Sequence, residues 1–226
     1  MPRAHTVKGY PQTAATLQVQ RSGCLSGFII PPLAVIVIST LLASFALRSP
    51  AYSLAELPPQ PSRISPIFTT EIQHWASSIS GWTAVSGLDP NLVATVMQIE
   101  SCGDPRAVSH SGAIGLFQVM PFHFTGVDNP YNPDTNAARG LAYLERSLEA
   151  AGGNARLALA GYNGGIGVIS RAEWTWSDQT QRYVKYGWPI YQDARSGISF
   201  SAAVQEWLTR YGASLCSQAH KSLELP

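Results

Sequence analysis

The chain has 226 residues, of which 45 % are hydrophobic and 13 % are charged. The charged fraction is about half of the ~25 % found in an average soluble chain, which excludes a charge-rich disordered protein. Fifteen Lys and Arg residues against fourteen Asp and Glu residues give a net charge of +1. The basic excess of a typical nucleic-acid-binding protein is therefore missing, and we expect no nucleic-acid partner. Three cysteines are too few for a disulfide scaffold, although two suffice for one bridge.

The N-terminal region contains an apolar segment of membrane-spanning length. Residues 22–47 include no Asp, Glu, Lys, Arg or His, and residues 28–47 would form a helix ~30 Å long, the thickness of a hydrocarbon core. Pro31 and Pro32 near its start could kink this helix or shorten its regular part. Arg3, Lys8 and Arg21 precede it without any acidic residue. By the positive-inside rule, the N-terminus is then cytoplasmic and the rest of the chain is exported.

The same segment is compatible with three interpretations. It is an uncleaved signal anchor, a signal peptide removed after a small-x-small site such as residues 44–46 or 53–55, or a buried core helix. The long region before it, about 26 residues, favours the anchor. We therefore expect a single-pass protein of the plasma membrane with its main domain outside the cytoplasm, or a secreted protein if the segment is cleaved.

Composition divides the chain into five parts. A basic cytoplasmic tail (1–27) and the transmembrane helix (28–47) are followed by a linker (48–69), whose five prolines predict a semi-rigid, extended spacer. The remaining residues are sufficient for one globular domain (70–215) and a short C-terminal tail (216–226).

The main domain has a helical pattern. Asp89-Pro90 combines a capping Asp with Pro at the first helical position, and predicts a helix that ends before Gly103. The periodicity of apolar residues predicts further helices over residues 70–79, 134–151, 154–162, 178–194 and 200–211. The Gly- and Ser-rich residues 103–116 could hold a small hairpin. The predicted fold class is therefore mainly α with a minor β element.

Glu100 is the candidate catalytic residue. It ends the helix that begins after Asp89, and Val96, Met97 and Ile99 just before it are apolar. Apolar surroundings remove hydration from a carboxyl and raise its pKa, and the negative end of the helix dipole acts in the same direction. A carboxyl that stays protonated near neutral pH can serve as a general acid at a glycosidic oxygen. The alternative is a solvated Glu at a frayed helix end.

Motifs for other chemistry are missing. The sequence contains no Gly-x-Ser-x-Gly elbow, no phosphate-binding loop and no clean dinucleotide glycine motif. Its histidines lack metal-ligand spacing, and we expect neither a metal nor a cofactor. They are His5, His74, His110, His123 and His220.

Three motifs occur in order between residues 98 and 184. The first begins with Glu100-Ser101 and continues with Pro105, Ala107, Ser109, Gly112-Ala113, Gly115-Leu116, Gln118 and Met120-Pro121. The second is Tyr162-Asn163-Gly164-Gly165, and the third is Thr180-Gln181-Arg182-Tyr183-Val184. Together they resemble the lytic transglycosylases of the soluble-transglycosylase (SLT) type, a branch of the lysozyme-like superfamily.

This resemblance implies a fold, a substrate and a reaction. The fold is a lysozyme-like domain with a groove for a glycan strand, and the partner is the glycan strand of peptidoglycan. The reaction cleaves the β-1,4 bond between N-acetylmuramic acid and N-acetylglucosamine, and the muramyl C6 hydroxyl closes a 1,6-anhydro ring without water. Two alternatives stay open: a lysozyme-type hydrolase that uses water, and a non-catalytic glycan-binding module.

The resemblance also implies residue roles. Glu100 acts first as acid and then as base, because the motif contains one clear acid and the substrate supplies the nucleophile. Asp104, the nearest other carboxyl, is interpreted as a turn residue instead of a second catalytic acid. Substrate contacts are expected from Ser109, Gln118, Tyr162, Asn163 and Tyr183, with the Tyr162 hydroxyl orienting Glu100; the alternative for each is plain packing.

Glycines and departures from the family pattern complete the prediction. We expect Gly112 and Gly115 to allow positive φ or a close approach to the sugar. Gln179 stands where the family often has Glu, so the contact that the third motif makes with the groove in the family does not carry over directly to this residue. Gly161 replaces the usual Ala, with a loss of helix propensity of ~1 kcal/mol. Phe117 stands where Met is common.

Two cysteines lie in the part expected to be exported. Cys102 and Cys216 could pair in an oxidising compartment and tie the C-terminal region to the catalytic segment; two thiols are the alternative. Cys24 precedes the apolar segment, the wrong order for a lipoprotein cysteine, and is interpreted as an ordinary thiol. We expect the protein to be a monomer.

Overall fold

A computed structural model of the chain describes residues 63–226. The predicted tail 1–27, the predicted transmembrane helix 28–47, Cys24 and most of the predicted linker lie outside the described residues. Within residues 63–226, none of the helices combines the length and the apolar character that crossing a membrane requires.

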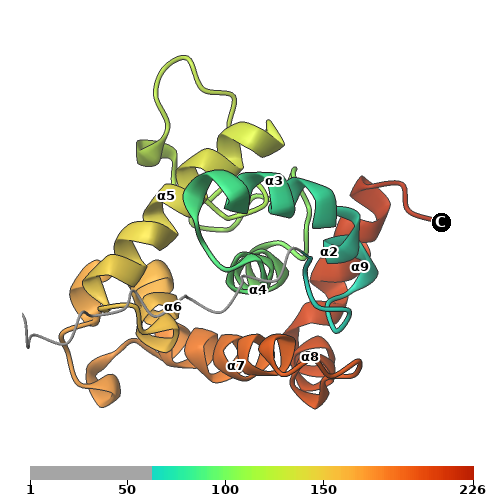
Figure 1. Cartoon of the computed structure of the whole chain (residues 1–226). Coiled ribbons are helices and arrows are strands. Elements are labelled where there is room, and N and C mark those ends of the chain that lie inside the picture. Colours follow the sequence, from blue (N-terminus) through green and yellow to red (C-terminus); the bar gives the residue numbers. More distant parts are fainter. Residues whose placement is uncertain (1–62) are drawn as a thin grey trace, which may run out of the picture. The chain divides into compact units, whose positions relative to one another are not determined.

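The described part is helical (Figure 1). Short 3₁₀ turns connect several of its helices, and a π-helical turn, Leu208–Gly212, links the last two. The α-helices are α2 (Thr70–His74), α3 (Ala76–Ser86), α4 (Pro90–Glu100), α5 (Pro133–Ala150), α6 (Ala155–Gly164), α7 (Asp178–Arg195), α8 (Ala202–Trp207) and α9 (Ala213–Ser222).

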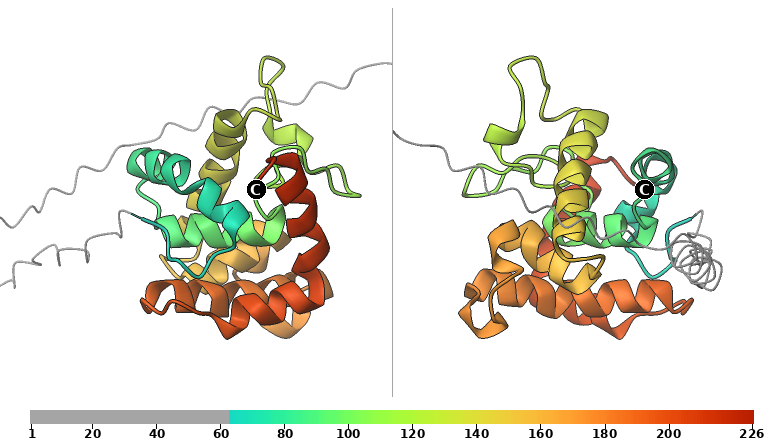
Figure 2. Two further views of the ribbon diagram at one scale, coloured as in Figure 1. Left: turned by 90° about the vertical axis from the view of Figure 1, so that its right-hand side faces the viewer. Right: turned by 60° about the vertical axis from the view of Figure 1, so that its left-hand side comes forward.

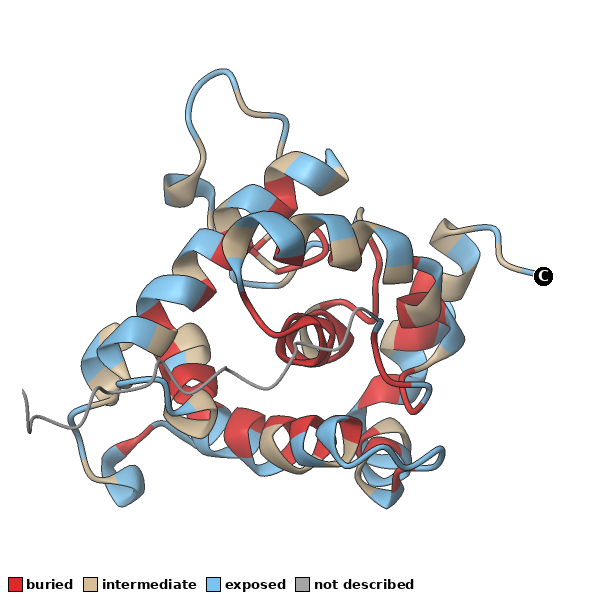
Figure 3. Cartoon of the chain, in the orientation of Figure 1, coloured by how far each residue is buried: buried red, intermediate tan, exposed pale blue. Residues whose placement is uncertain are grey.

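Helix α4 is the centre of this unit. In Figure 1 it is seen nearly end-on, with the other helices around it, and Figure 3 shows that it is buried on almost all sides. Its residues from Pro90 to Gln98 are buried, and the polar ones among them, Asn91, Thr95 and Gln98, form hydrogen bonds. Helix α7 packs along it, and both views of Figure 2 show the two helices next to each other. The last residue of α4 is Glu100.

The start of α4 is fixed by Asp89, as the sequence predicts. One carboxylate oxygen of Asp89 accepts a hydrogen bond from the backbone N–H of Asn91 at 2.8 Å. The other accepts from the Tyr191 hydroxyl of α7 at 2.9 Å and lies 3.6 Å from Nε of Arg195. One buried side chain therefore caps the central helix and joins it to α7.

The structure corrects the predicted linker and the first helix. Ile64, Ile67 and Phe68 are buried in the core, so residues 63–69 pack against the domain instead of forming a spacer. The helix predicted over residues 70–79 breaks at Trp75 into α2 and α3. The indole of Trp75 is buried there and donates a hydrogen bond to the carbonyl of Gly103 at 2.9 Å, which accounts for the break.

The predicted β hairpin is also corrected. The described residues contain no strand; residues 103–119 form turns with two isolated antiparallel bridges, Val108 with Ile114 and Ile114 with Val119. Ile114 takes part in both bridges. A turn over Ser109–Gly112 precedes it and a turn that begins at Gly115 follows it, so no continuous ladder of paired residues forms. The fold is mainly α.

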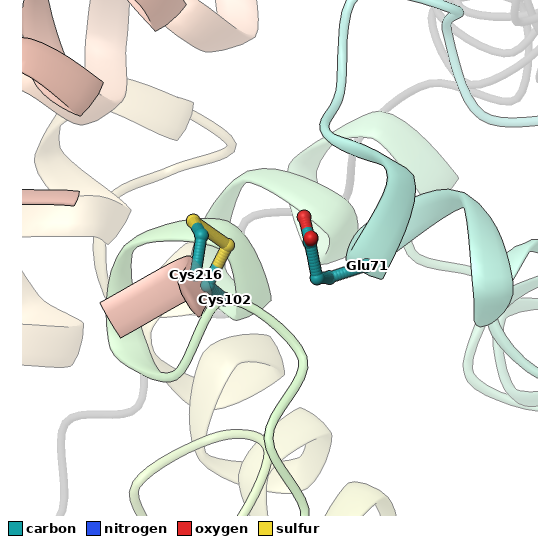
Figure 4. A group of neighbouring side chains, drawn as sticks. All are labelled: Glu71, Cys102 and Cys216. Carbon is teal, nitrogen blue, oxygen red and sulfur yellow. A yellow bond between two sulfur atoms is a disulfide. The ribbon is translucent and has the colours of Figure 1, made fainter. Parts of the chain in front are cut away.

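At the C-terminus, α9 includes residues 216–222, which were predicted to form a tail. Ala219 is fully buried and Cys216 nearly so, so one face of α9 packs on the core. Cys102 and Cys216 form a disulfide bond with a Cα–Cα distance of 5.0 Å. Glu71 of α2 lies beside this bond (Figure 4) and contacts Nδ1 of His220 at 3.0 Å.

Replacement of Asp89 by Ala tests the anchoring of α4. We expect a loss of roughly 1–3 kcal/mol in the free energy of unfolding, because a helix cap is lost and the buried Tyr191 hydroxyl is left without its acceptor. Asp89→Asn is the matched control, since its amide can keep the cap and the contact with Tyr191, and it should lose less than half as much. Urea unfolding measures both variants. An Asp89→Ala variant as stable as wild type would contradict this account.

Candidate active site

Glu100 lies at the C-terminal end of α4, where the helix leaves the core. Burial removes water from the carboxyl and raises its pKa from 4.5 to about 8. Tyr183 of α7 lowers the pKa, but by less than burial raises it. The carboxyl is therefore mostly protonated at neutral pH, as the sequence analysis predicted from its apolar neighbours.

Glu100 borders a cleft of about 210 Å³, which we call the Glu100 cleft. Its walls come from α4, α6, α7 and the C-terminal helices, and they contain no second Asp or Glu. The lining residues are Ile99, Glu100, Asn163, Gln179, Arg182, Tyr183, Tyr186, Trp207, Tyr211 and Leu215. A single carboxyl thus faces this cleft.

A second hollow, the aromatic cavity, has a volume of about 290 Å³ and shares Asn163 with the Glu100 cleft. It is lined by residues 118–120, 122–123, 140, 143 and 162–165, and again none of them is an Asp or Glu. Asn163 therefore borders both hollows, and we refer to the Glu100 cleft and the aromatic cavity together as the groove.

A series of aromatic rings runs along the aromatic cavity toward Glu100. Phe122, which is 75 % exposed, lies 4.5 Å from His123 between ring centroids. His123 lies 5.0 Å from Tyr143, and Tyr143 lies 5.7 Å from Tyr162. Burial, and to a lesser extent the charge of Arg146, lower the pKa of His123. Neutral rings in such a series offer faces for the apolar sides of sugar units.

The second motif places its residues at the groove, with one difference from the expectation. The Tyr162 hydroxyl donates a hydrogen bond to the carbonyl of Phe117 at 2.7 Å, so its proton is used there and does not orient Glu100. Burial, followed by the nearby charge of Glu100, raises the pKa of Tyr162 well above 10. Asn163 lines both hollows and accepts a hydrogen bond from the Thr180 hydroxyl at 3.2 Å.

Tyr183, from the third motif, lines the Glu100 cleft next to the carboxyl. Its ring is buried, and within residues 63–226 its hydroxyl forms no hydrogen bond of normal geometry, although it is close enough to Glu100 to lower the pKa of that carboxyl. Burial and the charge of Glu100 raise the pKa of Tyr183 well above 10. A buried hydroxyl thus keeps its proton and has no fixed acceptor beside the catalytic candidate.

The side chains of Gln118 and Ser109, both of the first motif, form hydrogen bonds within the loop that carries them. The Gln118 amide nitrogen donates to the carbonyls of Gly115 and Ala107, at 3.0 and 3.2 Å, while its side chain borders the aromatic cavity. The Ser109 hydroxyl accepts a hydrogen bond from the N–H of Ala113 at 2.9 Å, and Ser109 lines neither hollow. The structure therefore brings Gln118 to the groove and leaves Ser109 in a turn.

Asp104 does not face Glu100 across the groove. Its side chain is buried and accepts a hydrogen bond from the N–H of Arg106 at 2.8 Å, the geometry of a turn. Like Ser109, it lines neither the Glu100 cleft nor the aromatic cavity. This agrees with the interpretation of Asp104 as a turn residue.

Asn136 of α5 holds the loop that carries the first motif, residues 101–120, which we call the motif loop, although no sequence motif marks Asn136. Its amide is fully bonded: it accepts from the N–H of Phe117 at 2.9 Å and donates to the carbonyls of Ile114 and Pro130 at 2.8 and 3.0 Å. Gly115 has a φ of +75°, and a Cβ there would lie 2.5 Å from the Asn136 nitrogen. Gly112 also has a positive φ, so the prediction for both glycines is confirmed.

The departure at Gly161 has a packing reason. A Cβ at this position of α6 would lie 2.6 Å from the terminal carbon of Ile169. Glycine therefore lets the segment after α6 pack directly against the helix that carries Tyr162 and Asn163, at the expense of helix propensity.

Within residues 63–226, one group of potential metal ligands is close-packed. The ligand atoms of Glu71, Cys102 and Cys216 lie within 4.8 Å of one another. Figure 4 draws these three side chains. Both sulfurs belong to the disulfide bond, so they are not thiolates and this group does not fit a metal.

Comparison with known proteins agrees with the motifs. Residues 77–184 match the family model described as the transglycosylase SLT domain. The match covers α4 with Glu100, the motif loop, Tyr162 and Tyr183.

Three relatives illustrate this similarity. The transglycosylase of Enterobacteria phage PRD1 is 39 % identical over 111 residues, which are 48 % of this chain and 40 % of that protein. The endo-type membrane-bound lytic murein transglycosylase A of Klebsiella pneumoniae is 38 % identical over 74 residues, 27 % of this chain and 36 % of that protein. The membrane-bound lytic murein transglycosylase C of Actinobacillus pleuropneumoniae is 38 % identical over 71 residues, which are 26 % of this chain and 20 % of that protein. The chain thus spans two fifths or less of each relative.

The buried carboxyl predicts a pH-dependent stability difference for Glu100→Gln. Below pH 4.5 the carboxyl is protonated in both the folded and the unfolded chain. Above it, only the unfolded chain ionises freely, so wild type loses stability as the pH rises toward about 8. The upper limit at pH 7 is ~3 kcal/mol. Because the side chain is partly exposed, we expect Glu100→Gln to be more stable than wild type by ~1–2 kcal/mol at pH 7.

Thermal unfolding of both proteins at pH 4 and pH 7 measures this difference. The two curves should nearly coincide at pH 4 and separate at pH 7, with the variant unfolding at the higher temperature. Equal stability at pH 7 would mean that the carboxyl is hydrated.

The pH dependence of activity is the second prediction of this site. A general acid must be protonated, so kcat/KM should fall as the pH rises through about 8. Tyr183→Phe removes the group that lowers the pKa of Glu100, and should move this fall to higher pH whatever it does to the maximal rate. Turbidity loss of purified cell-wall sacculi, followed from pH 5 to pH 10, provides both profiles. A fall that stays in place in the variant would separate Tyr183 from the ionisation of Glu100.

Proposed function

We propose that the chain is a peptidoglycan lytic transglycosylase with a lysozyme-like catalytic domain. It cleaves the β-1,4 bond between N-acetylmuramic acid and N-acetylglucosamine and leaves a 1,6-anhydro-muramyl end. The observation that carries the proposal is the single carboxyl of Glu100, with its pKa raised to about 8, in a cleft whose lining contains no other acid. The SLT domain over residues 77–184 supports the same function.

The first step uses Glu100 as an acid. Its carboxyl gives a proton to the glycosidic oxygen, the bond between the muramyl C1 and this oxygen breaks, and the N-acetylglucosamine unit leaves with a free hydroxyl. Positive charge then develops on C1 and the ring oxygen, and the acetamido oxygen of the muramyl unit stabilises it. Glu100 is now a carboxylate in a desolvated site, where Tyr183 is the hydroxyl that can donate to it.

The second step uses the same residue as a base. The Glu100 carboxylate takes the proton of the muramyl C6 hydroxyl, and the C6 oxygen forms a bond with C1. Proton and electrons balance without water, and Glu100 returns to its protonated state. Ordinary glycosidases need two carboxylates, for a nucleophile or for an activated water. Here the substrate supplies the nucleophile, which is why one carboxyl is sufficient.

Other residues of the groove bind and position the strand. We assign Asn163 to an acetamido group, because this residue lines both hollows and an amide side chain can donate and accept hydrogen bonds. The aromatic series at Tyr143 and Phe122 supports the sugar faces, and Gln118 borders this part of the groove. Tyr162 is a positioning residue, because its hydroxyl donates a hydrogen bond to the carbonyl of Phe117 and so holds the loop of the first motif.

The apolar segment 28–47 is proposed to tether this domain to the outer side of the plasma membrane, as an uncleaved anchor. Two of the relatives are named membrane-bound, which supports membrane association. The proposed division of the chain keeps the tail 1–27 in the cytoplasm and the catalytic domain, now including residues 63–69 and α9, outside.

Glu100→Gln tests the proposed reaction. We expect turnover to fall by several orders of magnitude while the fold is kept, because Gln has nearly the same shape and cannot transfer a proton. Sacculi are digested with wild type and variant, and the muropeptides are weighed by mass spectrometry. Wild type should give anhydro products, which are lighter than hydrolysis products by one water.

Two outcomes contradict the proposal in different ways. Products with the added mass of water would identify a lysozyme-type hydrolase that uses the same groove. Strand binding without any cleavage by wild type would identify a non-catalytic glycan-binding module.

A further inference from the structure

One side of the Glu100 cleft is built by the C-terminal segment of the chain. Trp207, Tyr211 and Leu215, which we call the C-terminal wall, line this cleft and follow residue 184, where the match to the family model ends. They are spaced four residues apart on the continuous helical segment formed by α8, the π-helical turn and α9. This spacing places side chains on one face of a helix, so the segment presents one face to the cleft.

Local packing fixes the C-terminal wall. Gly212 lies directly against the indole of Trp207, and a Cβ at this position would overlap the ring. The ring centroid of Tyr211 lies 5.2 Å from that of Tyr186 of α7, and Leu215 packs against the hydrophobic core. Apolar and aromatic side chains thus bound this side of the cleft, and such a boundary removes hydration from a nearby carboxyl.

The Cys102–Cys216 bond (Figure 4) joins the C-terminal wall to the residues that follow Glu100. Cys216 is adjacent to Leu215 in the chain, and Cys102 comes two residues after Glu100. Both cysteines are buried. Because the bond holds their Cα atoms 5.0 Å apart, the wall and the end of α4 cannot separate at this point while the bond is intact.

The backbone of Cys102 points to a role for this cysteine beyond core packing. Its φ is +51°, in the left-handed region, and its N–H donates a hydrogen bond to the carbonyl of Gln98 at 3.2 Å, which closes the end of α4. Glycine is the usual residue in this capping conformation, because a Cβ disfavours it. A cysteine here therefore lowers the stability of the helix end, while its bond fixes the path of the chain immediately after Glu100.

We propose that the Cys102–Cys216 bond is a positioning element of the active site: it holds the C-terminal wall beside Glu100 and so limits the access of water to the carboxyl. The catalytic part of this inference rests on the proposed transglycosylase function, whereas the shielding of the carboxyl can be measured without any activity. In this role the bond acts through the wall and touches neither the glycan strand nor the reacting atoms.

The other ionisable groups that line the cleft or interact with Glu100 within residues 63–226 do not account for a protonated carboxyl. They are Tyr162 of α6, Arg182, Tyr183 and Tyr186 of α7, and Tyr211 of the wall. A cation favours the ionised form of a neighbouring carboxyl, and so does a hydroxyl that donates a hydrogen bond to it. Tyr183 acts in this direction on the pKa of Glu100. Burial is the cause that raises this pKa, so a cleft opened to water should lower it.

Removal of the bond tests this role. Cys216→Ala lacks the bond, and the double variant Cys102→Gly, Cys216→Ala lacks it while glycine accommodates the positive φ. In the full chain, we expect the pKa of Glu100, followed by NMR of its carboxyl carbon, to fall by roughly one unit or more in both variants, because water enters the cleft. The alkaline fall of kcat/KM on sacculi should move to lower pH by the same amount, since a general acid must be protonated.

Leu215→Ala and Ile79→Ala complete the comparison. Leu215→Ala shortens the wall but keeps the bond, and it should also lower the pKa of Glu100, which provides a test even if the variants without the bond do not fold. Ile79 is fully buried in α3, and none of the α3 residues, all of which the structure describes, lines the Glu100 cleft. Ile79→Ala leaves a cavity that destabilises the domain, yet it should keep the wild-type pKa of Glu100.

Each outcome decides a stated point. If the variants without the bond, or Leu215→Ala, keep the wild-type pKa of Glu100, the bond does not shield the carboxyl through the wall. If Cys216→Ala lowers the pKa but the double variant does not, the bond acts on the backbone of Cys102 and the wall is not involved. An equal fall in Ile79→Ala would show a general effect of lost stability and overturn the proposal. If wild type releases no anhydro product, the proposed function itself fails, while the NMR comparison still decides the role of the bond.

Discussion

The structure depends on the desolvation of one carboxyl at the end of a buried helix. Helix α4 passes through the core, and its last residue, Glu100, reaches the groove half-buried, with its carboxyl desolvated. Burial keeps this carboxyl protonated at neutral pH, which costs folding stability and supplies an acid. Asp89, Asn136 and the Cys102–Cys216 bond hold the two ends of α4 and the loop after it, so the fold sustains this unfavourable burial.

Much of this arrangement follows from local sequence. Asp89-Pro90 marks the start of α4, the apolar residues before Glu100 predict its raised pKa, and the motif glycines predict positive φ. These features involve neighbours in the chain, where capping, periodicity and backbone conformation act directly. The sequence therefore predicted the helical class correctly, and the catalytic role of Glu100 stays a prediction.

The missed features depend on contacts between distant residues. Trp75 interrupts a helix because its indole bonds to Gly103, and α9 packs through Ala219 and through Cys216, which is bonded to the distant Cys102. The hydroxyl of Tyr162 bonds to Phe117, and Asn136 looks like an ordinary polar residue of a helix. The periodicity of apolar residues gives no information on such long-range contacts. Motif membership is also insufficient: Ser109 was predicted to contact substrate because it belongs to the first motif, but its hydroxyl accepts a hydrogen bond within a turn.

The most direct test of the central claim is the pKa of Glu100 itself. The carboxyl carbons of ¹³C-labelled glutamate are followed by NMR from pH 4 to pH 10, and the Glu100 signal is assigned by its loss in Glu100→Gln. The account predicts a midpoint near 8 for this signal. A midpoint near the ordinary value of 4.5 would show a hydrated, ionised carboxylate at neutral pH and contradict the account.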